Sequence, residues 1–118
     1  MADRAGSAMT PGVLASLERH IEQARVALGG DDHETAATVA LALMRNADAM
    51  AASMPHAPGT DSRTARAIID LRNELGCRVL AAQQLGEAGV PASVVVGVLR
   101  RGTETASGIL RTLDRAAS

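Results

Sequence analysis

Residues 28–36 have the sequence Leu-Gly-Gly-Asp-Asp-His-Glu-Thr-Ala, which ends one helix and begins another. Gly29 and Gly30 stop the preceding helix, since glycine readily adopts the backbone conformation found just past a helix end. Asp31, with Glu34 three residues later, is typical of a capping box at a helix start. So short a link between two helices predicts an antiparallel helical hairpin.

Apolar residues recur every three or four positions on both sides of this turn, which is the period of a helix with one buried face. Before the turn, Thr10 and Pro11 form a helix-start signal, and the apolar stripe consists of Leu14, Leu17, Ile21, Ala24 and Leu28. After the turn, the stripe consists of Ala36, Ala40, Leu43, Ala47, Met50 and Met54, with Val39 and Met44 beside it. Pro55, Pro58 and Gly59 end the second helix.

The second half of the chain predicts another pair of helices. Thr60 or Asp61 can cap a third helix, whose stripe consists of Ile68, Leu71, Leu75, Val79, Ala82 and Leu85, and which Gly86 and Gly89 close. Val90 and Pro91 open a fourth helix with the stripe Val95, Leu99, Ala106, Ile109 and Leu113. Gly97, Gly102 and Gly108 each weaken this helix by ~1 kcal/mol relative to Ala, so its stability depends on docking against its neighbours.

These patterns predict an all-α fold, a four-helix antiparallel bundle made of two helical hairpins in a single domain. The length of 118 residues is close to that of one domain. We expect the bundle to cover residues 10–118 and the small, polar residues 1–9 to form a disordered tail. Apolar residues make up 47% of the chain without any Phe, Trp or Tyr, so the core must pack small aliphatic side chains closely.

Charge and cysteine content argue against several classes of protein. The 12 basic residues, all Arg, nearly balance the 13 acidic ones, which argues against a nucleic-acid partner or an anionic membrane. Residues 1–59 hold 4 Arg and 7 acids (−3) and residues 60–118 hold 8 Arg and 6 acids (+2), so we expect the halves to dock. No apolar run is long enough to span a membrane. A single cysteine, Cys77, excludes an internal disulfide and favours a cytoplasmic location.

The chemically reactive side chains form no recognisable catalytic or metal-binding motif. Residues 31–34 combine three carboxylates with an imidazole, but adjacent helix positions point in different directions, and helix capping explains them better. His20, His33 and His56 have no partner at the spacing of a catalytic triad. Cys77 is interpreted as a small, semi-buried core residue. We therefore predict no enzymatic activity, no cofactor and no metal ion, although distant residues can converge in the fold.

One segment has the rhythm of a helix-turn-helix motif. Its scaffold positions are residues 85–90, with the sequence Leu-Gly-Glu-Ala-Gly-Val, followed by Ser93, Val95, Val98 and Leu99. The second helix offers Ala92, Val94, Val96 and Gly97 where contacts to base edges need polar side chains. Arg100 and Arg101 suit phosphate contacts, which do not specify sequence. A small DNA-binding regulator that uses residues 82–101 is therefore an alternative prediction.

Residues 14–54 resemble the small helical export chaperones of the flagellar type III secretion system, of the FliT and FlgN kind. The resemblance lies in the chain length, the helical bundle, and a first hairpin at residues 21–37 followed by an arginine such as Arg45. It implies a bacterial chaperone that shields an aggregation-prone helix of an export substrate. It also implies that a C-terminal helix can occlude the binding face.

We accordingly predict a protein-binding adaptor or chaperone that holds an amphipathic partner helix in an apolar groove between the second, third and fourth helices. The predicted contacts are Leu43, Met50, Met54, Val79, Leu99 and Ile109. Because the partner would replace the fourth helix, deletion of residues 91–118 is expected to strengthen binding. A further alternative is a structural homo-oligomer joined through Gly97, Gly102 and Ala106, since small residues permit close helix contact.

Overall fold

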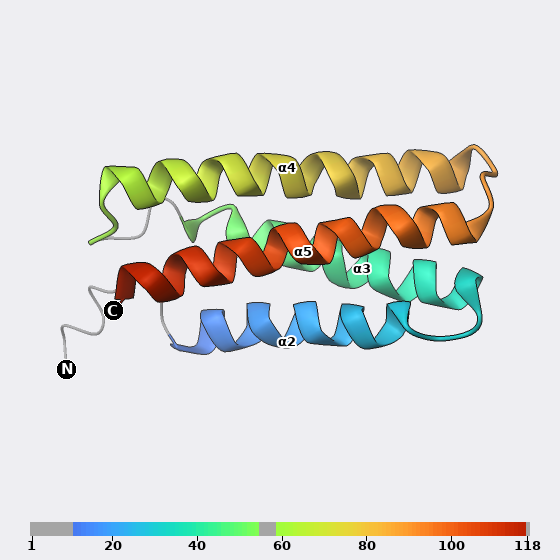
Figure 1. Ribbon diagram of the computed structural model, residues 1–118, viewed down its shortest axis with the longest axis horizontal. Coiled ribbons are helices and arrows are strands. Elements are labelled where there is room, and N and C mark those ends of the chain that lie inside the picture. The colour runs from blue at the N-terminus through green and yellow to red at the C-terminus, as the bar shows by residue number, and fades with distance from the viewer. Residues whose placement is uncertain (1–10, 55–58, 118) are drawn as a thin grey trace.

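Four long helices make up the part of the chain that the computed structural model describes, residues 11–54 and 59–117 (Figure 1). Helices α2 (Pro11–Leu28) and α3 (His33–Ala51) form one antiparallel hairpin, and α4 (Ser62–Glu87) and α5 (Ala92–Ala117) form the other. The predicted all-α, four-helix antiparallel bundle is confirmed. The expectations for residues 1–9, Thr10, Pro55, His56 and Pro58 lie outside the described residues.

The start of α3 is capped by Asp32. One carboxylate oxygen, Oδ1, accepts hydrogen bonds from the backbone N–H groups of Glu34 (3.1 Å) and Thr35 (3.4 Å), and Oδ2 accepts one from the Thr35 hydroxyl (2.8 Å). These bonds favour the ionised carboxylate, and the hydroxyl of Thr35 contributes most to lowering the pKa of Asp32. The prediction that Asp31 caps this helix was wrong by one residue, because α3 begins at His33 and Asp32 therefore occupies the N-cap position.

Both ends of α4 follow the chemistry predicted from the sequence. Asp61, rather than Thr60, is the N-cap, and its carboxylate accepts a 2.7 Å hydrogen bond from the backbone N–H of Thr64. At the other end Gly89 has φ +80°, a left-handed conformation that glycine adopts without strain. The N–H of Val90 donates to the carbonyl of Leu85 (3.1 Å) and that of Gly89 to Gly86 (3.1 Å), which is a Schellman turn. This turn reverses the chain into α5.

The core is a continuous aliphatic seam along the bundle. Most of the predicted stripe residues of α2, α4 and α5 are buried, and this confirms the predicted inward faces of those helices. For α3, four of the six predicted stripe residues are buried, namely Ala36, Ala40, Ala47 and Met54. The other two, Leu43 and Met50, are half-buried, whereas Met44 and Ala51 are fully buried and Val39 is 42% exposed. The buried apolar residues are Leu17, Ile21, Ala24, Leu28, Ala36, Ala40, Met44, Ala47, Ala51, Met54, Ile68, Leu75, Val79, Ala82, Val95, Val96, Leu99, Ala106, Ile109 and Leu113.

The inward face of α3 follows from the way α3 and α5 meet. These two helices contact each other across the centre of the bundle, whereas α2 and α4 do not touch among the described residues. Small residues make this close approach possible: Ala40 and Ala47 of α3 are fully buried, as is Ala106 of α5. A Cβ on Gly102 would lie 3.7 Å from Met44 Cε. Helix α5 therefore contacts all three other helices, and the two halves of the chain dock as predicted.

Candidate functional site

The six residues predicted to bind a partner do not line an open surface. Leu99 and Ile109 of α5 are 1% and 0% exposed, and Met54 and Val79 are also buried in the core. Leu43 and Met50 are half-buried at its edge. Because a partner reaches the four buried residues only if the bundle opens, their role in binding stays a prediction.

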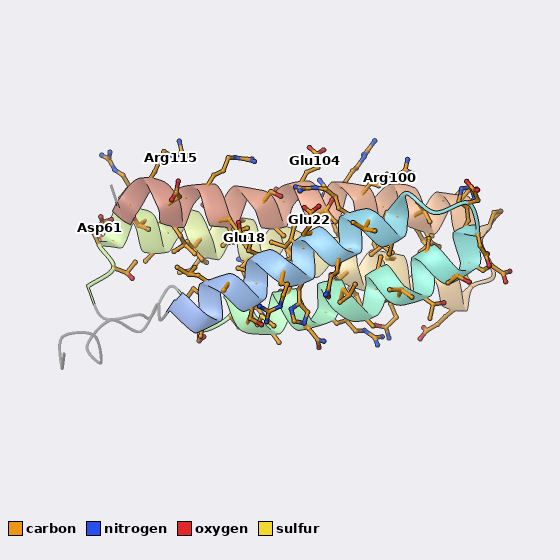
Figure 2. The ribbon with its side chains drawn as sticks, turned by 90° about the horizontal axis from the view of Figure 1, so that it is seen from below. Glu18, Glu22, Asp61, Arg100, Glu104 and Arg115 are labelled. Carbon is orange, nitrogen blue, oxygen red and sulfur yellow. The ribbon has the colours of Figure 1, made fainter. Side chains whose placement is uncertain are left out.

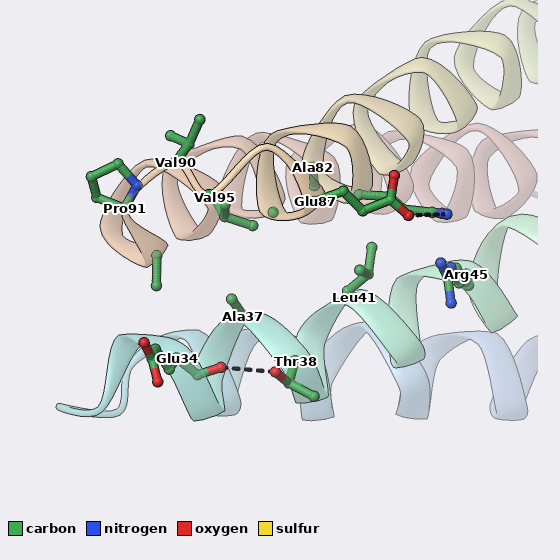
Figure 3. Close-up of a pocket in the computed structure, with 14 residues that line it drawn as sticks. Glu34, Ala37, Thr38, Leu41, Arg45, Ala82, Glu87, Val90, Pro91 and Val95 are labelled. Atoms are coloured by element: carbon green, nitrogen blue, oxygen red, sulfur yellow. Dashed lines mark hydrogen bonds between the residues drawn. The ribbon is translucent and has the colours of Figure 1, made fainter.

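An open groove lies instead between the N-terminal half of α3 and the turn that joins α4 to α5 (Figure 3). Its volume is about 610 Å³, which is within the range of ligand pockets. None of the six predicted residues lines it. The lining residues are Glu34, Ala37, Thr38, Leu41, Arg45, Ala82, Gln83, Gly86, Glu87, Gly89, Val90, Pro91, Ala92 and Val95.

The floor of the groove is apolar and built from small side chains. Ala82 and Val95 are buried beneath it, and Figure 3 shows Ala37 and Leu41 directed from α3 toward them. A Cβ added to Gly86 would meet no atom within 4 Å. Since facing alanines and glycines cannot fill the space between two helices, α3 and the α4–α5 hairpin leave a gap at this end of the bundle. Periodicity alone gave no signal for this gap.

The rim of the groove carries polar and charged side chains of both signs. Glu34, Thr38 and Arg45 project from α3, and Gln83 and Glu87 from α4. The Thr38 hydroxyl donates to the backbone carbonyl of Glu34 (3.0 Å), and the Gln83 amide donates to Glu87 Oε2 (3.4 Å). An apolar floor with a charged rim matches an amphipathic ligand, which presents an apolar edge between polar flanks.

A smaller polar cleft of about 260 Å³ lies between α4 and α5. Its centre is Glu74, whose Oε2 accepts a 2.8 Å hydrogen bond from the buried Thr105 hydroxyl and a 3.2 Å bond from Arg78. The bond from Thr105, followed by that from Arg78, lowers the pKa of Glu74. The network joins the two helices of the second hairpin, and its donors and acceptor are already paired with each other.

Arg100, which the helix-turn-helix prediction assigned to phosphate binding, contacts the first hairpin. Its Nη2 donates a 3.0 Å hydrogen bond to the carbonyl of Leu28. A cation at the last carbonyls of α2 satisfies an orphan acceptor and opposes the negative end of the helix dipole. Figure 2 shows Arg100 and Glu104 on α5 and Glu22 on α2, the two helices that this bond joins.

The helix-turn-helix prediction does not match the geometry of the segment. Residues 82–101 belong to two long antiparallel helices that lie alongside each other (Figure 1), whereas the motif needs two helices that cross steeply. Val96, one of its predicted base-reading positions, is buried in the core. The segment therefore gives no support to a DNA-binding function.

Two further predictions about single residues were wrong. Cys77 is exposed rather than semi-buried, because it lies on the outer side of α4, away from the core. Gly97 is exposed, whereas Gly102 and Ala106 are buried, so the three do not form the one small-residue face that was predicted for contact between subunits. Five residues along a helix correspond to a rotation of about 140°, which places Gly97 away from Gly102.

The histidines and carboxylates do not converge on a metal site in the described ranges. There, no group of three or more His, Cys, Asp or Glu side chains is placed to hold a metal ion. His20 Nδ1 lies 2.8 Å from the carbonyl oxygen of Ser16 and donates to it one turn back on its own helix. His33 is the exposed first residue of α3.

No protein-family model, no curated protein and no solved structure matches this chain. Along residues 11–54 and 59–117, none of the helices combines the length and the apolar character needed to cross a membrane.

Proposed function

We propose that this chain is a protein-binding adaptor or chaperone that holds an amphipathic helix of another protein in the groove between α3 and the α4–α5 turn. The observation that carries the proposal is the groove itself, with an apolar floor and a charged rim in a folded bundle. Helix-in-groove recognition uses this combination, because the partner buries its apolar edge and keeps its polar flanks in water. An export substrate, which the resemblance of residues 14–54 implies, is one such partner.

The dimensions of the groove suit a short helical segment. Along α3 its lining extends from Glu34 to Arg45, a distance of about 16 Å, which corresponds to about three turns of a partner helix. Ala37 and Leu41 are one turn apart and half-buried, with small neighbours on α4. Side chains such as Leu or Met, one turn apart on the partner, can therefore insert between them.

Binding in this groove does not require α5 to leave the bundle. Helix α5 packs against α2, α3 and α4, so its release would expose core residues such as Leu99 and Ile109. A preformed groove avoids this penalty, which would otherwise reduce the apparent affinity. The structure thus favours a docking site at the end of the bundle over one that displaces a helix.

The absence of Trp, Tyr and Phe from the chain provides a clean binding assay. The probe is a synthetic amphipathic helix of about 18 residues with Leu at helical spacing and one Trp, compared with a scrambled isomer of the same composition. We expect a saturable blue shift of the Trp emission with the helix and none with the scrambled isomer. All of the signal comes from the peptide.

Two arginine substitutions on α3 form a matched pair for this assay. Leu41→Arg places a long charged side chain on the floor of the groove and is expected to weaken binding by more than about tenfold. Val39→Arg changes an exposed residue on the same helix that does not line the groove, and should leave affinity unchanged. Circular dichroism checks that both variants fold. No saturable binding, or equal weakening by both substitutions, would contradict the proposed site.

A further inference from the structure

Helix α4 has an uncovered outer face along which a stripe of uncharged side chains runs. The helix packs against α3 and α5 but does not contact α2 in the described residues, and it forms one edge of the bundle in Figure 1. At helical spacing along this face lie the exposed residues Ile69, Asn73, Cys77, Leu80 and Gln84. Ile69 is 38% exposed and Leu80 is 52% exposed. From Ile69 to Gln84 the uncharged stripe is about 22 Å long.

The two ends of this stripe carry opposite charges. Arg66 precedes Ile69 by three residues and Glu87 follows Gln84 by three residues, and both side chains are exposed. A second α4 that runs antiparallel brings the basic end of one stripe to the acidic end of the other. Such a surface is self-complementary, which is the requirement for a two-fold interface between identical chains.

We propose that the outer face of α4 is the interface of a homodimer, in which the α4 helices of two copies pack antiparallel about a two-fold axis. This surface shares Glu87 with the rim of the groove but contains no residue of the groove floor, and the inference does not depend on the proposed function. The uncharged stripe supplies the buried centre, and the terminal charges fix the direction of the pairing.

The stripe specifies the register of the pair. Ile69 lies beside Leu80 of the second copy when the axis passes between residues 74 and 75. Arg66 then lies within about one turn, ~6 Å along the axis, of Glu87 in the second copy. Asn73 and Cys77, both exposed, flank the axis. Asp70 lies at the edge of the stripe, where it faces uncharged residues of the second copy.

Sedimentation equilibrium of the full chain tests the dimer directly. We expect the wild-type chain to form a dimer with a dissociation constant below about 0.5 mM. Leu80→Glu is expected to raise this constant by more than about tenfold. Val26→Glu is the matched control, because Val26 is 69% exposed on α2 and far from the proposed interface. It should remain dimeric. A monomeric wild-type chain, or a Leu80→Glu variant that dimerises as well as wild type, would overturn the proposal.

A charge swap separates the proposed pairing from nonspecific association. Arg66→Glu alone places two acidic side chains together and should weaken the dimer, and adding Glu87→Arg should restore it. An unspecific apolar contact would show no such rescue, and failure of the rescue therefore counts against the antiparallel register. Since the assay contains no partner peptide, its outcome is independent of the groove.

The single native cysteine gives a third readout. In the proposed register the two Cys77 residues lie on the same side of the helix pair and about 7.5 Å apart along its axis. A short bismaleimide should therefore link wild-type chains rapidly at a chain concentration above the dimer dissociation constant. The control, Val26→Cys with Cys77→Ser, presents an equally accessible thiol on α2 and should not be linked. Equal cross-linking of both chains would contradict the interface.

Discussion

Two glycines of the second hairpin, Gly89 and Gly97, have different structural roles that the sequence alone does not distinguish. Gly89 has φ +80° and completes the turn after α4, whereas Gly97 lies within α5, is exposed, and has no atom within 4 Å of the position its Cβ would occupy. Neither position is limited by space, so backbone conformation alone distinguishes the effect of adding a methyl group. The sequence places Gly89 just after a helix and Gly97 within one, but it does not specify their φ angles.

Replacing these two glycines by alanine should change stability in opposite directions. Gly97→Ala is expected to stabilise the fold by up to ~1 kcal/mol, because alanine restricts the unfolded chain and favours the helix. Gly89→Ala is expected to destabilise it by ~1 kcal/mol, because an L side chain strains a positive φ. Chemical denaturation followed by circular dichroism measures both values. A stabilising Gly89→Ala would show that the turn does not need a left-handed residue.

The N-cap of α3 should make stability depend on pH. Hydrogen bonds from Thr35 lower the pKa of Asp32 in the folded state below its ordinary value of 3.8. A lowered folded-state pKa stabilises the fold above the unfolded-state pKa, and this contribution is lost as the pH falls through the folded-state value. Asp32→Asn keeps an acceptor at the N-cap without the titration.

We therefore expect the melting temperature of wild type to exceed that of Asp32→Asn at about pH 6, and the difference to shrink by about pH 2.5. Asp61 and Glu74 also have lowered pKa values, but both groups are present in wild type and in Asp32→Asn, so their contributions to the pH dependence cancel in the comparison. A difference that stays constant over this range would contradict the assigned role of the Asp32 carboxylate.

Among the helices, α5 is intrinsically weak but central to the fold. Its glycines lower helix propensity, and its buried residues contact the other three helices. The sequence predicted the buried stripe of α5 correctly, since this stripe is regular, whereas the dependence of its stability on docking stays a prediction. It predicted the inward face of α3 only in part, because Met44 rather than Leu43 is buried. That choice is made by the approach of α5 through Gly102 and Ala106, a long-range contact with no local signature.

Core truncation in α5 should therefore be costly, whereas truncation of its surface should not. Ile109→Ala is expected to destabilise the bundle by about 2–5 kcal/mol, because Ile109 is fully buried between helices. Val94→Ala, at a position that is 47% exposed, should change stability by less than about 0.5 kcal/mol. Urea denaturation measures the difference. Similar values for the two variants would show that α5 is not docked as described.

Deletion of residues 91–118 is expected to unfold the bundle, because α2, α3 and α4 would each lose the surface that packs against α5. This expectation differs from the one drawn from the sequence, in which the deletion strengthens partner binding. Circular dichroism of the truncated chain decides between them. A truncated chain that stays helical and cooperative would favour the release of α5 as a binding mechanism.

At the scale of the whole molecule, the fold was more predictable from the sequence than the site. Helix stripes, caps and glycine turns are local signals, and they specify two hairpins and most of the core. The groove depends on how two hairpins meet, and it exists because Ala37, Ala82 and Gly86 are small where α3 faces α4. Sequence reasoning instead selected larger side chains such as Met54 and Ile109, which are buried because they are large and apolar.

The most direct test of the proposed groove is NMR mapping of the full-length chain as the amphipathic Trp peptide is added. We predict that the perturbed backbone amides cluster at residues 34–45 and 82–95, on both walls of the groove, while those of residues 11–27 remain unchanged. Perturbations centred on α2, or spread over the core with loss of the α5 signals, would show that the partner binds elsewhere or by opening the bundle.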